Sequence, residues 1–318
     1  MELVLDFERP LVELQKRISS LQALQANEGL DLSASILQLE QQAAGLHRQI
    51  FSALTPWQRT QLSRHPARPY TLDYVEHLFT DFEEVHGDRQ GFDDDSIVAG
   101  MARYKGQAVA VLGHQKGRNT KENIVRNFGM PKPEGYRKAM RTMRLADKFN
   151  RPIFTFIDTP GAFPGIEAEA RGQAEAIARN ILEMSSLKVP VICTVIGEGG
   201  SGGALAVGVG NRVLMLENSI YSVISPEGCA AILWRDRAEG PKAASALKIT
   251  ATDCLRNGIA DEVIEEPACG AHRDWKATAE RLDGVLERHL EELSKLDGQA
   301  LAEDRYDRFR KLGALAGA

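Results

Sequence analysis

The sequence predicts an α/β protein with parallel strands, and two strand–glycine–helix segments lead to this prediction. In the first, an apolar run over 152–158 meets a glycine-containing turn and a predicted helix over 167–187. In the second, a β-branched apolar run over 189–196 ends in five glycines between Gly197 and Gly203. Strands that are apolar on both faces are typical of a buried parallel sheet. Right-handed crossovers would bring both turns to one sheet edge, where α/β proteins bind ligands.

A helical hairpin is predicted at the start of the chain. Apolar residues recur every three or four positions in two stripes, over 11–21 and over 36–50. This spacing is typical of amphipathic helices. Gly29 lies near the turn between the stripes, where a left-handed residue commonly ends a helix.

A third helix is predicted to start at Thr55. Thr55 can cap it, Pro56 suits its first position, and Gln58 can complete a capping box. We expect the whole N-terminal helical region, residues 1–66, to pack on a partner or on the rest of the chain rather than to carry chemistry.

The middle of the chain is predicted to begin after the proline-rich turn at 65–69. Three consecutive aspartates, 93–95, fit no metal-loop pattern and are expected in solvent. Lys105-Gly106 is the predicted turn of a β-hairpin. In chain order the expected elements are a helix over 70–86, a polar turn over 87–96, strands over 97–104 and 107–113, and a helix over 135–148.

Short strands and helices are expected beyond the glycine-rich centre. Ser225 can cap a helix with Pro226 at its first position, and Gly258 ends another. The expected elements are strands over 212–217 and 220–224, helices from 226, over 242–247 and over 252–257, a strand over 261–265, and a charged amphipathic tail over 274–312. The predicted domains are the helical region 1–66, a core over 67–273 and a helical tail over 274–318.

Composition places the chain among ordinary globular proteins. Of its 318 residues 43% are hydrophobic and 26% charged. It has no apolar run of the ~20 residues that a membrane helix needs, and its start lacks the features of a signal peptide, so we expect a cytoplasmic protein. The four cysteines are widely separated, without a Cys-x-x-Cys pair, so we expect free thiols and no metal site in this chain.

Positive charge is concentrated in one segment of an otherwise acidic protein. Eleven lysines and arginines but only three acidic residues lie between His114 and Arg151, while the whole chain has a net charge of −5. This asymmetry suggests an anionic ligand, although a solvated helix face would have the same composition. Nucleic acid is a weaker interpretation, because the segment has few aromatic residues on which bases could stack.

The glycine cluster fits several motifs. Gly197-x-Gly199-x-x-Gly202 matches a dinucleotide fingerprint, but strands already precede it, whereas that fingerprint normally opens its domain. The Gly-x-Ser-x-Gly pattern around Ser201 matches a nucleophile elbow, which needs a later acid and histidine; His272 and His289 are the only later histidines. The Gly-Lys-Ser/Thr of a P-loop is absent from the sequence.

Two main-chain sites for a negatively charged oxygen are therefore predicted, at Gly161-Ala162 and at Gly202-Gly203. Such sites stabilise an enolate or a similar oxyanion through backbone N–H groups. Glu167 and Glu198 are the adjacent carboxylates, and neither is an obvious base. The alternative is that the glycines serve only tight strand–helix packing.

Six segments together resemble the alpha-subunit family of the carboxyltransferase of bacterial-type acetyl-CoA carboxylase. The resemblance covers nearly the whole chain, including the N-terminal helices. The segments are Gly113-His-Gln-Lys-Gly-Arg118, Arg126-Asn-Phe-Gly-Met-Pro131, Pro133-Glu-Gly-Tyr-Arg-Lys138, Asp158-Thr-Pro-Gly-Ala-Phe-Pro-Gly165, Gly197-Glu-Gly-Gly-Ser-Gly-Gly-Ala204 and Ser222-Val-Ile-Ser-Pro-Glu-Gly-Cys229.

The resemblance implies a crotonase-like (ClpP/crotonase) fold, a spiral of ββα turns with the helical hairpin before it and the helical tail after it. It also implies a heterotetramer of two alpha and two beta subunits, in which the beta subunit holds a four-cysteine zinc ribbon. The implied reaction moves a carboxyl group from carboxybiotin, on the biotin carboxyl carrier protein, to acetyl-CoA. The product is malonyl-CoA for fatty acid synthesis, and a separate biotin carboxylase loads the biotin.

The resemblance also implies roles for the turns. Carboxybiotin releases carbon dioxide, the ureido anion takes a proton from the acetyl methyl group, and the enolate attacks carbon dioxide, so no protein base is required. The alpha subunit is expected to hold the biotin oxygen through Gly202 and Gly203, with Gly161 and Ala162 lining the same pocket. Further residues expected to bind cofactor or carrier are Gly199, Gly200, Lys116, Arg118, Arg126, Arg137 and Lys138.

Two other functions stay open on the sequence. A crotonase-type hydratase or isomerase would need Glu167 or Glu198 as a catalytic carboxylate. A non-catalytic scaffold would use the N-terminal hairpin to recruit partners.

Overall fold

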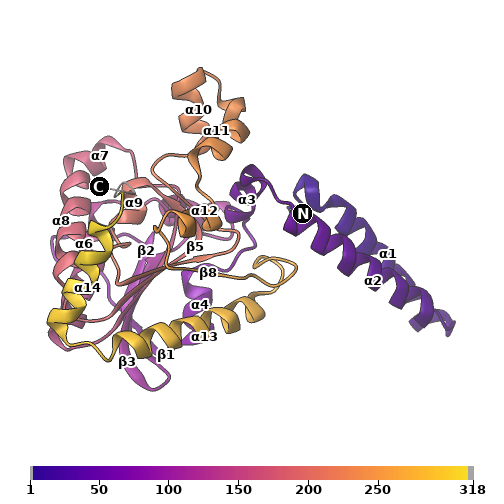
Figure 1. Ribbon diagram of the computed structural model, residues 1–318, viewed down its shortest axis with the longest axis horizontal. Coiled ribbons are helices and arrows are strands. Elements are labelled where there is room, and N and C mark those ends of the chain that lie inside the picture. Colours follow the sequence, from indigo (N-terminus) through magenta and orange to yellow (C-terminus); the bar gives the residue numbers. More distant parts are fainter. Residues whose placement is uncertain (1–2, 314–318) are drawn as a thin grey trace.

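The computed structural model describes residues 3–313, and a single eight-stranded sheet runs through its centre (Figure 1). Seven strands lie in the order β1-β2-β3-β4-β5-β6-β8, and β7 pairs with the end of β5. The strands are β1 (Thr80–Glu84), β2 (Ile97–Tyr104), β3 (Gln107–His114), β4 (Ile153–Thr159), β5 (Val191–Gly200), β6 (Arg212–Leu216), β7 (Ile220–Ser222) and β8 (Glu262–Ile264).

The central strands are parallel, as predicted. β3 pairs with β4, β4 with β5, and β5 with both β6 and β7 in parallel register, whereas β1, β2 and β3 are antiparallel. Every residue of β4 and β5 is buried. Thr159 pairs with Gly199, so both strands end at the same edge of the sheet.

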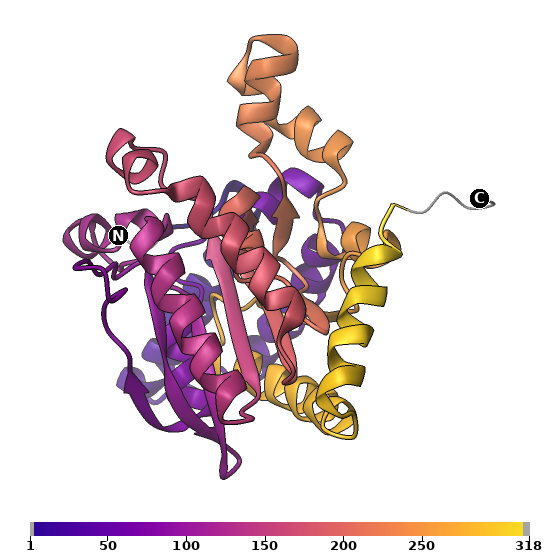
Figure 2. The same cartoon turned by 90° about the vertical axis from the view of Figure 1, so that its left-hand side faces the viewer.

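Helices cover both faces of the sheet. Along β4, Ile153 and Ile157 pack in the hydrophobic layer beneath α6 (Pro133–Lys148) and α8 (Gln173–Ser186), while Phe154 and Phe156 point to the opposite layer. This alternation follows from the two-residue period of a strand. Figure 2 shows α6 and α8 in front of the sheet. The opposite face is covered by α4 (Thr71–Leu78) and α13 (Trp275–Leu293).

The N-terminal hairpin is confirmed. α1 (Arg9–Glu28) and α2 (Ser33–Ser52) run antiparallel and project from the body (Figure 1). Gly29 ends α1 in the left-handed conformation with φ of 67°, which glycine adopts without steric cost. Leu11 and Ile18 are the buried residues of the two helices.

α3 (Pro56–Ser63) begins with the predicted capping box. Thr55 Oγ1 accepts from the Gln58 N–H at 3.2 Å, and Gln58 Oε1 accepts from the Thr55 N–H at 2.8 Å. The caps are predictable because each depends on residues three positions apart.

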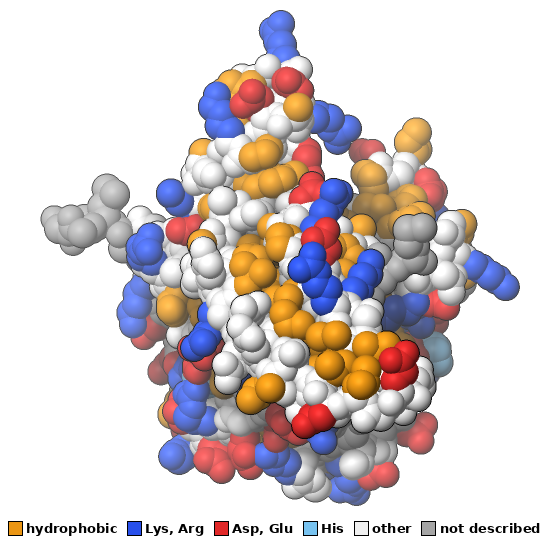
Figure 3. Space-filling view, turned by 90° about the vertical axis from the view of Figure 1, so that its right-hand side faces the viewer, with side chains coloured by type: hydrophobic (Ala, Val, Ile, Leu, Met, Phe, Trp, Pro, Cys, Tyr) orange, Lys and Arg blue, Asp and Glu red, His pale blue; other side chains and the backbone are white. Residues whose placement is uncertain are grey.

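A second projection, the α10–α11 arm, consists of α10 (Pro226–Trp234), η3 (Arg237–Glu239) and α11 (Gly240–Leu247) and rises from the body in Figure 1. Ser225 caps α10 as predicted, since its Oγ accepts from the Gly228 N–H. Figure 3 shows the face from which the hairpin projects, with hydrophobic side chains at its centre and on the arm above it.

The remaining helices are short or terminal. They are η1 (Asp6–Glu8), α5 (Thr120–Val125), η2 (Asn127–Gly129), α7 (Ile166–Ala170), α9 (Ser201–Leu205), α12 (Ala251–Arg256) and α14 (Gly298–Arg310). Arg305 of α14 is fully buried and donates to the carbonyls of Met184, Leu187 and Val189, which fixes α14 beside α8. Among residues 3–313 no helix is both long enough and apolar enough to cross a bilayer.

Three predictions about the elements are wrong in part. The helix expected over 70–86 stops at Leu78, and the next residues form the edge strand β1 against β2. The helix over 167–187 is broken at Gly172, whose φ is 86°, into α7 and α8. The C-terminal tail is helical, as predicted, and consists of two helices, α13 and α14.

The third error concerns the aspartates at 93–95. Asp94 is buried rather than solvated. Its carboxylate accepts from the Lys132 N–H at 2.7 Å, from Asn127 Nδ2 at 3.0 Å and from Ser96. Asp94 therefore holds the segment that precedes α6 in place through hydrogen bonds to its backbone and side chains.

Candidate functional site

The two glycine turns touch each other at the carboxyl edge of the sheet. A Cβ atom placed on Gly203 would lie 2.6 Å from the carbonyl carbon of Gly161 and 2.8 Å from the nitrogen of Ala162. Real Cβ atoms essentially never approach so closely. The two predicted oxyanion sites thus form one cradle, and position 203 admits only glycine in this arrangement.

The backbone geometry of the turns presents N–H groups. α9 starts at Ser201, so the amides of Gly202 and Gly203 lie in its first turn and have no partner within the helix. In the opposite turn the Gly161 N–H donates to Thr159 Oγ1 at 3.0 Å. Ala162 is therefore the better placed donor of that turn, and Gly161 shapes it through its φ of 148°.

Ser201 has a strained backbone at an exposed position. Its φ of 52° lies in the left-handed region, which costs a non-glycine residue roughly 1 kcal/mol or more. An apolar cavity of 180 Å³ opens beside it, lined among others by Leu205, Val223 and Phe309. The cavity gives an apolar wall next to the amino end of α9.

The other two predicted glycines act through close packing. A Cβ on Gly200 would lie 2.3 Å from the carbonyl oxygen of Pro160, and one on Gly199 would lie 2.8 Å from the ring of Tyr221. The absent side chain of Gly200 lets β5 approach the turn that follows β4, and that of Gly199 lets β5 pack against Tyr221 of β7. That they bind a cofactor remains a prediction.

Lys116 is linked to both glycine turns through Asp158 at the end of β4. Its Nζ lies 2.6 Å from Asp158 Oδ1, and the same oxygen accepts from the Glu198 N–H at 3.0 Å. Burial opposes the charge of Lys116, but Asp158 and Glu198 outweigh it and raise the pKa of Lys116. The sequence did not point to Asp158 as a functional residue, although it ends the strand that precedes the first turn.

Arg118 is held between two aromatic rings. Its guanidinium lies 3.8 Å from the ring centroid of Tyr70 and 4.6 Å from that of Trp275. It also pairs with Asp73 and donates to the carbonyl of Pro66. Through these contacts Arg118 joins the start of α13 to the loop before α4.

The other three predicted basic residues are tied to the polar loop before β2. Lys138 is fully buried, 2.7 Å from Asp93 Oδ1, and Arg137 pairs with Asp88 at 2.7 Å. Arg126 donates to the Asp95 carbonyl at 2.6 Å. Lys116 therefore lies at the glycine turns, whereas Lys138, Arg137 and Arg126 contact the loop before β2 instead. Their binding roles remain predictions.

His114 is a buried histidine beneath the site. It is fully buried, and its ring lies against the main chain of Gly203 and Phe156. Desolvation lowers the pKa of His114 to about 4, although Asp158 and the main chain at Gly203 oppose the shift. His65 is buried as well, and desolvation lowers its pKa to about 4. Both rings are therefore neutral near pH 7.

Because the pKa values of both histidines are low, the folded protein is expected to lose stability as the pH falls below 6.5. An unfolded histidine binds its proton near pH 6.5, whereas the folded rings resist until about pH 4, so stability falls as the pH drops through this window. At pH 5 each histidine is expected to cost about 1–2 kcal/mol relative to pH 7.5. Urea unfolding at both pH values measures the effect, and His65→Asn should reduce it. An unfolding midpoint that does not change between the two pH values would contradict the expectation.

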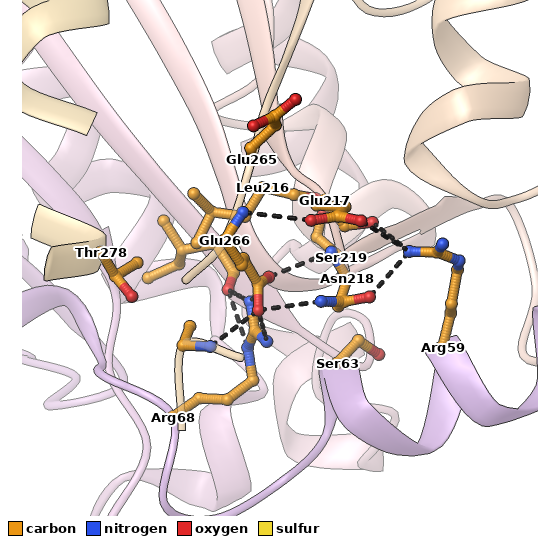
Figure 4. Close-up of polar contacts among 12 residues, drawn as sticks. Arg59, Ser63, Arg68, Leu216, Glu217, Asn218, Ser219, Glu265, Glu266 and Thr278 are labelled. Atoms are coloured by element: carbon orange, nitrogen blue, oxygen red, sulfur yellow. Dashed lines mark hydrogen bonds and ion pairs between the residues drawn. The ribbon is translucent and has the colours of Figure 1, made fainter. Parts of the chain in front are cut away.

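A buried ion pair fixes β5 just before the glycines (Figure 4). Arg68 Nη2 lies 2.7 Å from Glu266 Oε1 and also donates to the carbonyl of Ile196 at 2.9 Å. Asn218 donates to Glu266 through both its N–H and its side chain. Burial raises the pKa of Glu266, but Arg68 and these donors outweigh it and lower the pKa to about 2. No sequence pattern points to this pair, because its members lie almost two hundred positions apart.

The two carboxylates that an acid–base enzyme would need are placed differently. Glu198 is 5% exposed and pairs with Arg64 at 2.7 Å. Glu167 is exposed on α7. Neither is arranged as a free, buried base that points into the cradle.

One group of side chains has the composition of a metal site. Ligand atoms of Glu8, His65 and His272 lie within 4.8 Å of one another. His272 Nε2 lies 2.8 Å from Glu8 Oε1, and His65 already bonds to the Ala67 N–H and the Leu3 carbonyl. The Arg273 guanidinium, 3.7 Å from the same Glu8 oxygen, opposes a further cation. The group thus joins the N-terminal segment to the loop before α13.

Comparison with known proteins gives one consistent family. The family model described as acetyl co-enzyme A carboxylase carboxyltransferase-like matches residues 4–313. A Syntrophotalea carbinolica protein named acetyl-coenzyme A carboxylase carboxyl transferase subunit alpha is 61% identical over 98% of both chains. The Bacillus velezensis protein of the same name is 56% identical over 98% of this chain and 96% of its own.

Solved structures with a similar fold are more distant in sequence. A Pseudomonas malonate decarboxylase hetero-tetramer contains a chain with TM-score 0.59 and 17% identity, over 76% of this chain and 94% of that one. Transcarboxylase 12S has TM-score 0.54 and 22% identity, over 70% of this chain and 43% of that one. The beta subunit of Pseudomonas aeruginosa geranyl-CoA carboxylase has TM-score 0.53 and 20% identity, over 78% of this chain and 46% of that one. The fold they share with this chain confirms the crotonase-like prediction.

Proposed function

The chain belongs to the family of acetyl-CoA carboxylase carboxyltransferase alpha subunits, and from this premise we propose its substrates and its chemistry. Its reaction transfers a carboxyl group from carboxybiotin, carried by the biotin carboxyl carrier protein, to acetyl-CoA. The product is malonyl-CoA, and the step commits carbon to fatty acid biosynthesis.

The contact between the two glycine turns carries this proposal. Gly203 packs directly on Gly161 and Ala162, so the backbones of the two turns meet at one place. We assign this place to the ureido oxygen of biotin, which the amides of Gly202, Gly203 and Ala162 would hold. A preorganised donor of this kind typically contributes 10²- to 10³-fold to kcat.

Bound biotin would supply both the carboxyl group and the acceptor for the acetyl proton. The chain itself then needs to hold negative charge, not to move protons. This requirement fits Glu198, which is neutralised by Arg64, and Glu167, which faces solvent. The cavity beside Ser201 offers an apolar wall to the part of the ligand next to the oxyanion.

The active enzyme is proposed to be an α2β2 heterotetramer in the cytoplasm, with a zinc-ribbon beta subunit that holds the thioester oxygen. Biotin carboxylase would act on the same carrier protein. Exposed hydrophobic side chains on the α10–α11 arm support a partner surface: the neighbouring Ile232 and Leu233 are 72% and 63% exposed. Ile166, on α7 beside the first turn, is 85% exposed.

Malonyl-CoA decarboxylation with free biotin as acceptor tests the proposal. The chain copurified with its beta partner is expected to turn over, and the chain alone is expected to show no activity. Glu167→Gln should keep most of the activity, within about 5-fold, because the carboxylate has no proton to transfer. Hydration of an enoyl-CoA by the isolated chain, abolished by Glu167→Gln, would overturn the proposal in favour of a hydratase.

A further inference from the structure

Arg64 lies where three elements meet. It follows the last residue of α3, and its guanidinium reaches both the glycine turn and the α10–α11 arm. Nη2 lies 2.7 Å from Glu198 Oε1, while Nη1 lies 2.5 Å from Glu227 Oε1 in the first turn of α10. One side chain therefore connects the site to a projecting pair of helices.

Glu198 sits inside the glycine turn and depends on this partner. It lies between Gly197 and Gly199, and it is 5% exposed. A Cβ on Gly197 would lie 2.4 Å from Asp158 Oδ1, so the backbone there has little freedom to shift. A carboxylate buried at such a place needs a counter-charge. Arg64 supplies it by direct contact.

The arm is anchored near the same point. Trp57 of α3 packs against Gly240 at the start of α11, where an added Cβ would lie 3.2 Å from the indole ring. Burial raises the pKa of Glu227, but its hydrogen bond to Arg64 helps to lower the pKa below its ordinary value. Beyond these anchors the arm exposes Ile232 and Leu233.

We propose that Arg64 is a positioning residue for the oxyanion turn, and that through Glu227 it couples the geometry of this turn to the position of the α10–α11 arm. The inference rests on the proposed function, because it assumes that Gly202 and Gly203 hold an oxyanion. Arg64 acts through Glu198 and does not itself contact the reacting atoms.

Four forms of the complex with the beta subunit test the pairing in malonyl-CoA decarboxylation with free biotin. Arg64→Met should lower kcat on the order of 30-fold with KM for malonyl-CoA unchanged, because the buried Glu198 loses the counter-charge that contacts it directly. Glu198→Gln should stay within about 5-fold of the wild type. The double variant Arg64→Met/Glu198→Gln should return to the level of Glu198→Gln, a non-additive result that general loss of structure would not give.

Arg59→Met is the matched control. Arg59 lies on α3, five positions before Arg64, and it bonds to Asn218 Oδ1 at 2.7 Å and to the Glu217 carbonyl at 3.2 Å (Figure 4). The Arg59→Met variant thus loses a similar set of polar contacts, but at a place that does not touch the glycine turn. Its kcat should equal that of the wild type.

Glu227→Gln tests the coupling to the arm. It leaves the Arg64–Glu198 pair in place, and a kcat about 5-fold below the wild type with unchanged KM is expected. This variant is also informative if Arg64→Met does not assemble, because Glu227 is near the surface.

Three results would overturn the inference: wild-type kcat in Arg64→Met, wild-type kcat in Glu227→Gln, or a double variant as slow as Arg64→Met. An inactive wild-type complex would instead refute the proposed function, and the inference with it.

Discussion

Gly203→Ala is expected to lower kcat for malonyl-CoA decarboxylation about 1,000-fold in the complex with the beta subunit. The new methyl group would have to lie 2.6 Å from the Gly161 carbonyl carbon, so the two turns must separate. Separation removes the amides of both turns from one oxyanion. Steady-state kinetics with free biotin measures the loss, and copurification with the beta subunit shows that assembly is retained.

Gly202→Ala is the control for this result. A Cβ at position 202 would lie 3.6 Å from the side chain of Ile177, which is ordinary van der Waals contact. The Gly202 amide would remain in place, so kcat should fall by less than about 10-fold. Equal losses in the two variants would contradict the role of the contact between the turns, as would a Gly203→Ala enzyme within 10-fold of the wild type.

Arg68→Met is expected to lower the free energy of unfolding by about 3–5 kcal/mol. The substitution leaves the Glu266 carboxylate buried without its cation and removes two hydrogen bonds from the Ile196 carbonyl. Urea unfolding at pH 7.5 measures the change. Because the folded pKa of Glu266 is about 2, the contribution of the pair in the wild type should be complete above pH 4.5 and be lost as the pH falls towards 2.

Two further variants define this effect. Arg59→Met breaks bonds to the β6–β7 turn and a 3.7 Å ion pair with Glu217, whose side chain is 36% exposed, so no fully buried charge is left and about 1 kcal/mol is expected. The double variant Arg68→Met/Glu266→Leu should be more stable than Arg68→Met alone, because both charges are removed together. A double variant no more stable than Arg68→Met would mean that the lost packing, rather than the unpaired charge, sets the cost.

The parts of the fold that were predictable are those set by local sequence. The capping box at Thr55, the hairpin turn at Lys105-Gly106 and the buried strand β4 each depend on residues a few positions apart. β1 was missed because its pairing with β2 decides its conformation, and a short polar segment gives no such signal. Asp94 was misplaced because the donors that bury it lie up to 38 positions away.

In the candidate site, too, the features set by local sequence were predictable and the long-range contacts were not. The glycine turns were visible in the sequence, since glycine marks where backbone must approach backbone, and their mutual contact follows from parallel strands. The ion pairs around the turns were not visible in the sequence. Arg64 meets Glu198 and Arg68 meets Glu266 across 134 and 198 positions, distances that no periodicity spans. Of the five basic residues chosen from charge alone, Lys116 is the one that the structure gathers with the turns.

The anchoring of β5 from the C-terminal part of the chain has a consequence for biosynthesis. Glu266 reaches back to Arg68 beside Ile196, and Arg305 binds the Val189 carbonyl just before β5 begins. During translation the strand therefore emerges from the ribosome long before the residues that secure it. Contacts between such distant positions form late, so a nascent chain holds an unfinished sheet edge that needs protection until synthesis ends.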